Sequence, residues 1–442
     1  MCGAKTARVP ASFVTIVLTR IPLPSCGIAL NIAGLFGLLG TLSEFHPEVA
    51  WLLLPMCKPL LALTVSLQGI LALRAMVWWP SSDREQCGTL QIVGELHSTR
   101  AVSAYGALLI AVQLAWAHLY QLGAGTACLI VAHAASVGQY LLCARFLWLC
   151  FRQRKWPEPM WFPATVSLAT PALIAAQLGT PAVFASAALA AGVAVALIAW
   201  PLCVVRVLHD RLVAPGPGVF VQMAPVPFVT LAALGVLRVE HVHGAAEAPA
   251  WVCILLVVLV PLNIMSVLVT ALAATRRWRS FRGTLCPFQP AWAALTFPLV
   301  SSCLVAVLLD RFHSGGEVER MTGAVAGASA SAGTAPAAAG ALRVITDAWM
   351  RVLVPVTLIA VPLIDLLWLL ELPRWVCRCC GGVTPRRFES VRLPDGEVAA
   401  LLKDAESSCS SHGSSPCSSR AVRERVPVQV PARSEFDEIE FA

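Results

Sequence analysis

Ten long apolar runs constrain the fold of this chain more than any other feature. A helix of about 20 apolar residues matches the roughly 30 Å hydrocarbon core of a bilayer. The chain is 57% hydrophobic and 13% charged, with a mean hydropathy of +0.74, and a soluble interior cannot hide that much apolar surface. We predict an all-α integral membrane protein whose ten transmembrane helices lie at 24–42, 50–78, 101–120, 125–150, 158–176, 181–208, 218–237, 248–274, 290–309 and 344–372.

Basic residues alternate between the segments that connect these spans. Connecting segments after even-numbered spans carry ten lysines and arginines, whereas those after odd-numbered spans carry four: Arg238, Arg311, Arg320 and Arg343. Because cytoplasmic loops are enriched in basic residues, this alternation predicts that both termini are cytoplasmic. We expect the protein to lie in the plasma membrane.

The composition predicts three parts. Residues 1–23 form a short cytoplasmic segment, 24–372 form a membrane domain of five helical hairpins, and 373–442 form a polar, disordered cytoplasmic tail. The connection 310–342 is a low-complexity external loop with no packing pattern. None of the sixteen cysteines falls in an expected external loop, so a disulfide framework is not expected.

The tail offers two candidate modification sites. Three cysteines follow the last span among arginines, a pattern that favours palmitoylation: Cys377, Cys379 and Cys380. A metal site would need a second pair of ligands, and we predict none. Ser390 lies three residues after Arg387, which suits a basophilic kinase as a partner, although plain disorder accounts for this tail as well.

Odd and even spans differ in their charge. Prolines interrupt the first, fifth, seventh and ninth spans, and even spans also hold some, such as Pro55 and Pro59, so the contrast lies mainly in charge. Ionisable residues gather in the even spans, at Lys58, Arg145, Arg206, Asp347, Arg351 and Asp365. Broken helices are tolerated at membrane depth where the freed backbone groups meet protein or water. An inner ring of kinked, uncharged helices around an aqueous path would meet that condition, although prolines are also generally common in membrane helices. The prolines expected to line such a path are Pro24, Pro163, Pro225, Pro227 and Pro298.

Charges within a membrane span need partners or water. Lys58 and Asp347 lie at similar depths by residue count, so we predict a structural ion pair between two outer helices. The alternative is a proton relay in a coupled carrier. Asp365 lies too near the cytoplasmic end to pair with Lys58.

Phe297 and Pro298 stand side by side within the apolar stretch 291–309, AWAALTFPLVSSCLVAVLL. The proline removes a backbone hydrogen bond and kinks the helix. A large ring beside a kink suits a hydrophobic constriction, which gates by excluding water and ions. Packing in the core or against lipid is the alternative role for Phe297.

Four stretches resemble one family of transport proteins: IPLPSCGIALNIAGL (21–35), MWFPATVSLA (160–169), QMAPVPFVTLAALG (222–235) and WAALTFPLV (292–300). They are similar to the tellurite-resistance/dicarboxylate transporter family, also called the voltage-dependent anion channel family. That family includes bacterial tellurite-resistance channels, fungal malate permeases and sulfite exporters, and plant slow anion channels. The likeness covers about 24–372 and excludes both tails and the 310–342 loop.

The resemblance implies a quasi-five-fold arrangement of five hairpins, with odd helices lining a central pore and even helices outside. It also implies a homotrimer with one pore per subunit, and a pore closed by a phenylalanine at the position of Phe297. Two departures leave selectivity open. The third span has no proline, and no aromatic residue precedes Gly27.

The leading hypothesis is therefore transport of small anions or organic acids through a pore, without a cofactor. The runner-up is a proton-coupled C4-dicarboxylate or malate carrier. A pump is disfavoured because the chain has no GxxxxGK[ST] nucleotide loop. An intramembrane enzyme is disfavoured because its histidines are scattered over different helices. A receptor or scaffold acting through the tail is a further alternative.

Overall fold

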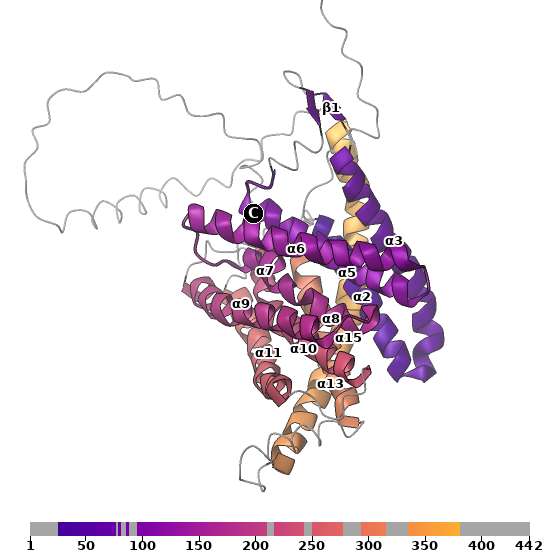
Figure 1. The fold of residues 1–442 in the computed structure, drawn as a ribbon, viewed down its shortest axis with the longest axis vertical. Coiled ribbons are helices and arrows are strands. Elements are labelled where there is room, and N and C mark those ends of the chain that lie inside the picture. Colours follow the sequence, from indigo (N-terminus) through magenta and orange to yellow (C-terminus); the bar gives the residue numbers. More distant parts are fainter. Residues whose placement is uncertain are drawn as a thin grey trace, which may run out of the picture. The chain divides into compact units, whose positions relative to one another are not determined.

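The structure is a computed structural model, shown in Figure 1. It describes residues 25–76, 78–80, 85–87, 95–209, 216–242, 250–276, 293–314 and 335–380. The chain divides into two units, Met1–Pro373 with Phe441–Ala442, and Arg374–Glu440. The contacts below belong to the first unit.

Long apolar helices make up the described part of the first unit, as the hydropathy pattern predicts. Nine of them are long and apolar enough to cross a membrane, which supports an all-α membrane protein. The helices formed by the first four spans are α2 (Ser25–Phe45), α3 (Pro47–Met76), α5 (Thr99–Gln121) and α6 (Thr126–Arg152). Those formed by later spans are α9 (Ala182–His209), α10 (Pro225–Val242), α11 (Ala250–Arg276), α13 (Ala293–Ser314) and α15 (Ala335–Cys380).

The fifth span is not one continuous helix. It consists of the 3-10 turn η1 (Pro159–Trp161), α7 (Phe162–Thr165), the 3-10 turn η2 (Val166–Ala169) and α8 (Thr170–Leu178). The seventh span likewise begins with a 3-10 segment, η3 (Gly216–Met223), ahead of α10. Prolines explain part of this, because Pro163 and Pro171 each lack the N–H that an α-helix needs.

Two predicted boundaries differ from the structure. The second span was expected to reach residue 78, but α3 ends at Met76 and a short antiparallel pair follows, β1 (Trp78–Pro80) with β2 (Glu85–Cys87). Both ends of the expected 310–342 loop are helical, because α13 continues to Ser314 and α15 begins at Ala335. For α13, the stretch Leu295–Asp310 is apolar but shorter than the other candidate spans.

The turns expected between paired spans are short. A single residue, His46, separates α2 from α3, and Gly123 and Gly125 take positive φ angles of 81° and 100° between α5 and α6. Gly179 ends α8 in the left-handed conformation at φ 64°, which few other residues adopt without strain. Each turn returns the chain beside the preceding helix, so α2 packs on α3, α5 on α6, and α8 on α9.

Odd and even spans differ in burial. Within an apolar 18-residue stretch of each span, 94% of the residues are buried in the seventh span and 78% in α2, whereas only 22% are buried in α3 and 28% in α15. The outer faces of the even helices expose large apolar side chains, including Trp51, Phe184 and Ile198. Such faces suit contact with lipid. The odd spans therefore form the interior of the unit.

Candidate functional site: the inner ring and Phe297

The five odd spans contact one another in cyclic order. The helix α2 packs on α5, α5 on α8, α8 on α10, α10 on α13, and α13 returns to α2. One apolar cluster contains buried residues from each of these spans, such as Ile32, Ile110, Ala172, Phe228 and Val305. We call these five spans the inner ring.

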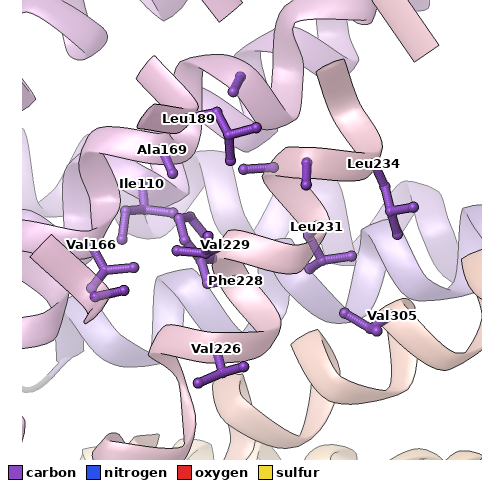
Figure 2. Close-up of a cluster of buried hydrophobic side chains, with 14 of the residues drawn as sticks. Ile110, Val166, Ala169, Leu189, Val226, Phe228, Val229, Leu231, Leu234 and Val305 are labelled. Atoms are coloured by element: carbon purple, nitrogen blue, oxygen red, sulfur yellow. The ribbon is translucent and has the colours of Figure 1, made fainter. Parts of the chain in front are cut away.

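Side chains of α10 occupy a central place in that cluster. In Figure 2, residues of α5, η2, α9 and α13 surround those of α10, among them Ile110, Val166, Leu189 and Val305. The spans approach closely because small residues face each other. A Cβ placed on Gly235 would lie 2.4 Å from the backbone oxygen of Ala172 in α8.

Phe297 lies on the inner ring, in the second turn of α13. Its ring packs against Phe228 of α10, with centroids 5.8 Å apart and planes inclined at 52°. It also faces α2, where a Cβ on Gly34 would lie 3.6 Å from Phe297 Cδ2 and 3.1 Å from Val300 Cγ1. Phe297 is partly buried against the apolar cluster. Three inner spans thus meet at this ring, and Gly34 leaves it room.

Phe297 and Pro298 lie near the start of α13. The helix begins at Ala293, so Phe297 is its fifth residue and Pro298 its sixth. The hydroxyl of Ser301 donates to the Pro298 carbonyl at 3.0 Å, whereas the bond that the proline removes is the one to the carbonyl of residue 294. The Phe297 ring therefore lies near the N-terminal end of α13.

The other predicted prolines have different positions. Pro225 and Pro227 are buried at the start of α10, and Pro298 is buried in α13. The carbonyl oxygen of Pro163 lies 2.5 Å from a Cβ position on Gly106, so α7 and α5 touch through their backbones. Pro24 lies outside the described residues.

The predicted ion pair between Lys58 and Asp347 is not what the structure has. Asp347 forms an ion pair with Arg351, one turn along the same helix, with its Oδ2 atom 2.9 Å from Arg351 Nη2. Lys58 is exposed on α3, and no ion pair among the described residues joins it to Asp347. Residue count predicts the depth of a charge but not the direction in which its helix turns it.

Arg145 and Arg206 are held near the ends of their spans. Arg145 donates to the Leu96 carbonyl at 3.2 Å. Arg206 donates to the carbonyls of Trp156 and Pro157, at 3.2 and 3.0 Å, and lies 3.8 Å from Glu158. These arginines therefore anchor the connecting segments, and neither faces the inner ring.

Several polar side chains are buried inside the bundle, and the hydropathy pattern alone did not single them out. Gln113 of α5 accepts from Ser136 of α6 at 2.9 Å, and Gln139 bonds with Ser167 in η2. Trp200 of α9 donates from Nε1 to the Gln222 carbonyl at 3.0 Å, which holds η3 in place. Such bonds fix the broken segments of the fifth and seventh spans.

The predicted tail sites lie outside the description. The backbone of α15 is helical as far as Cys380, but the side chains of Cys377, Cys379 and Cys380 are outside the described residues, as is Ser390. Among the residues that the structure describes, no group of three or more acidic, histidine or cysteine side chains is placed to hold a metal ion.

Comparison with known proteins returned no relative: no family model and no curated protein matches the chain.

Proposed function

We propose that this protein passes small anions or organic acids across a membrane, along a path at the centre of the inner ring that Phe297 closes. The observation that carries the proposal is the cyclic contact of the five odd spans, with the Phe297 ring placed where α2, α10 and α13 meet. A ring of five helices encloses an axis along which solute can cross. A hydrophobic side chain on that axis blocks water and ions until it moves.

The broken helices of the ring support the same function. The segments η2 and η3 interrupt the fifth and seventh spans, and both belong to the inner ring. Irregular backbone at membrane depth is tolerated where it is buried in protein or lines a path, and its N–H groups and helix ends bind anions in transporters. The inner ring can therefore meet an anion without a fixed cation, which would bind it too long for rapid flux.

The packed centre of the ring corresponds to a closed state. Phe228, Ile110 and Val229 are buried together there, and Phe297 is packed against the same cluster. Opening the path then requires side chains around Phe297 to move aside. Because Gly34 has no side chain, α2 places no Cβ against the Phe297 ring at this contact.

The finer architecture belongs to the same proposal. In this proposal the chain crosses the membrane ten times, as five quasi-equivalent hairpins. Both termini lie in the cytoplasm, and the protein lies in the plasma membrane. Three copies form a trimer in which each subunit has its own path. The exposed apolar faces of the even helices suit lipid and copy-to-copy contacts alike.

A proton-coupled C4-dicarboxylate carrier is the second candidate. The observation that favours it is a carboxyl group, Asp365, that is buried in α15 instead of facing water or lipid. A coupled carrier would move its substrate only when a proton gradient is present.

Flux into liposomes tests both candidates. Purified wild-type protein and Phe297→Ala are compared with chloride, nitrate, sulfite and malate, and Phe184→Ala on the exposed face of α9 is the matched control. We expect Phe297→Ala alone to raise flux, because it removes the closing ring. Malate uptake that appears only under a proton gradient would favour the carrier. Equal flux in all three proteins would contradict a gate at Phe297, and no flux of any anion from folded protein would contradict transport.

A further inference from the structure

Asp365 differs from the other charged residues of the even spans. It is 7% exposed, and neither of its carboxyl oxygens has a hydrogen bond in the structure. By contrast, Asp347 and Arg351 pair on an exposed face, and Lys58 is exposed. Burying a polar group without a partner is costly, and a buried charge costs more. A carboxyl group buried in this way therefore needs an explanation, either a functional role or a hydrogen-bonding partner such as a bound proton.

The group that faces Asp365 is the side chain of Asn31 in α2. Asn31 is fully buried, and the structure has no hydrogen bond to its amide nitrogen or its amide oxygen. Its amide is near enough to act on the Asp365 carboxyl, although no hydrogen bond joins the two groups in the structure. Two buried polar groups from different helices thus lie together, with four unpartnered atoms between them.

No described charged side chain acts on this carboxyl. The described ionisable side chains of the elements packed near it lie elsewhere: Cys26 and Glu44 lie five residues before and thirteen residues after Asn31 on α2, and Cys303 of α13 interacts with Thr357, about two turns from Asp365. His118 of α5 packs on Phe36, five residues after Asn31. The other described ones lie at other levels of α3, α13 and α15: Glu48, Cys57, Lys58, Asp310, Asp347 and Arg351.

One proton satisfies all four unpartnered atoms. An ionised carboxylate only accepts hydrogen bonds, so it pairs with the Asn31 NH₂ group and leaves the Asn31 carbonyl oxygen unsatisfied. A carboxylic acid both donates and accepts. Its O–H bonds to the Asn31 carbonyl oxygen while its C=O accepts from the Asn31 NH₂, which closes a ring of two hydrogen bonds.

We propose that Asp365 and Asn31 form a proton-binding site in the membrane domain. The site lies close to the proposed gate, because Gly34, which faces Phe297, is one helical turn from Asn31 on α2. A negative charge there repels an anion at the constriction, and binding of a proton removes the repulsion. This effect on transport rests on the proposed function, whereas proton binding itself does not.

The proton site is tested without transport by infrared difference spectroscopy of purified protein over a pH series. We expect a protonated-carboxyl band that titrates in the wild type, is absent in Asp365→Asn and persists in the control Asp347→Asn. Asn31→Leu should keep the band but shift its position and its titration midpoint. A spectrum in which no band depends on Asp365 would overturn the proposal. Loss of the band on adding sodium at constant pH would also overturn it, in favour of a metal-cation site.

The link to transport is tested by anion flux in the same variants, with Phe297→Ala as an open background. As the pH rises, flux should fall on the order of tenfold, as expected for a unit charge about 10 Å from the path at an effective dielectric constant of about 20. Asp365→Asn should stay at the high level at every pH. A titrating band with no flux in any variant would support the proton site and contradict the proposed function. A wild-type pH profile that Asp365→Asn leaves unchanged would overturn the link to the gate.

Discussion

The aromatic rings of Phe228 and Phe297 pack together at the junction of α10 and α13, with centroids 5.8 Å apart. Phe228 is buried and held by its neighbours, whereas Phe297 is only partly buried. The buried Phe228 ring therefore supports the less buried Phe297 ring in its present position. Aromatic pairs of this kind contribute roughly 0.5–1.5 kcal/mol beyond the area that they bury.

Replacing Phe228 should loosen the proposed gate without removing it. We expect Phe228→Ala to raise anion flux by about two- to tenfold, since the lost pair energy of roughly 0.5–1.5 kcal/mol favours other rotamers of Phe297. The increase should be smaller than that in Phe297→Ala. Liposome flux measures it, and the control is Phe146→Ala, which removes an equally buried ring that packs on Trp161 with centroids 5.4 Å apart. A Phe146→Ala increase of the same size would mean that general loosening, not the Phe228–Phe297 contact, is responsible.

Close backbone contact at Gly235 makes this position intolerant of any side chain. A Cβ there would lie 2.4 Å from the Ala172 oxygen and 2.9 Å from the Leu173 Cα, and backbone atoms cannot swing away as a flexible side chain can. We expect Gly235→Ala to destabilise the protein by about 1–3 kcal/mol, as overpacking does. Thermal unfolding in detergent measures the change.

The matched control for Gly235→Ala is Gly37→Ala in α2. A Cβ at Gly37 has nothing within 4 Å, and alanine favours a helix over glycine by about 1 kcal/mol. Gly37→Ala should therefore leave the unfolding temperature unchanged or raise it. If both variants unfold at the wild-type temperature, the prediction is wrong, and α10 and α8 do not pack as closely at Gly235 as described above.

The exposed pair Asp347–Arg351 should contribute little to stability. Its side chains are 48% and 77% exposed, and exposed ion pairs of this spacing contribute about 0.3–0.5 kcal/mol. A double-mutant cycle with Asp347→Ala and Arg351→Ala should give a coupling energy of that order, and a cycle with Asp347→Ala and Lys58→Ala should give none. A coupling above about 1 kcal/mol between Asp347 and Lys58 would restore the ion pair that depth alone suggested.

The bond from Trp200 to the Gln222 carbonyl should be needed to hold η3 in place. Trp200→Phe keeps a ring but leaves that buried carbonyl without its 3.0 Å donor, which should cost about 1–3 kcal/mol. The control is Trp251→Phe on α11, where the indole is 42% exposed. Chemical denaturation in detergent compares the two, and an equal loss in both would contradict a specific role for the Trp200 bond.

Hydropathy predicted the positions of the helices well, but it could not predict which side of each helix faces inward. Nine of the ten predicted spans appear as helical segments long enough to cross a membrane, and the remaining one, the ninth, is the shorter apolar helix α13. The sequence also indicated that odd and even spans differ, because the ionisable residues gather in the even spans. Prolines predicted a kinked fifth span, but the hydropathy did not locate the break at η2, because the span remains apolar throughout.

The candidate site was predicted only in part. Phe297 could be singled out because a bulky ring beside a proline is conspicuous in an apolar run, and it does lie on the inner ring. Its neighbours Phe228 and Gly34 could not be, since they are ordinary residues of their own spans and come near Phe297 only when three helices pack. The same holds for Asn31 and Asp365, which are far apart along the chain.

By itself the sequence determined that this chain forms membrane-spanning helices, because crossing about 30 Å of hydrocarbon requires an uninterrupted apolar run, a property of consecutive residues. Tertiary structure alone decided which side of each helix faces inward. These helices are apolar on every side, so no strong amphipathic pattern sets their rotation, and packing between small residues such as Gly235 and Ala172 sets it instead. That rotation turns Asp347 and Arg351 outward together, turns Asp365 inward to Asn31, and brings Phe297 against Phe228.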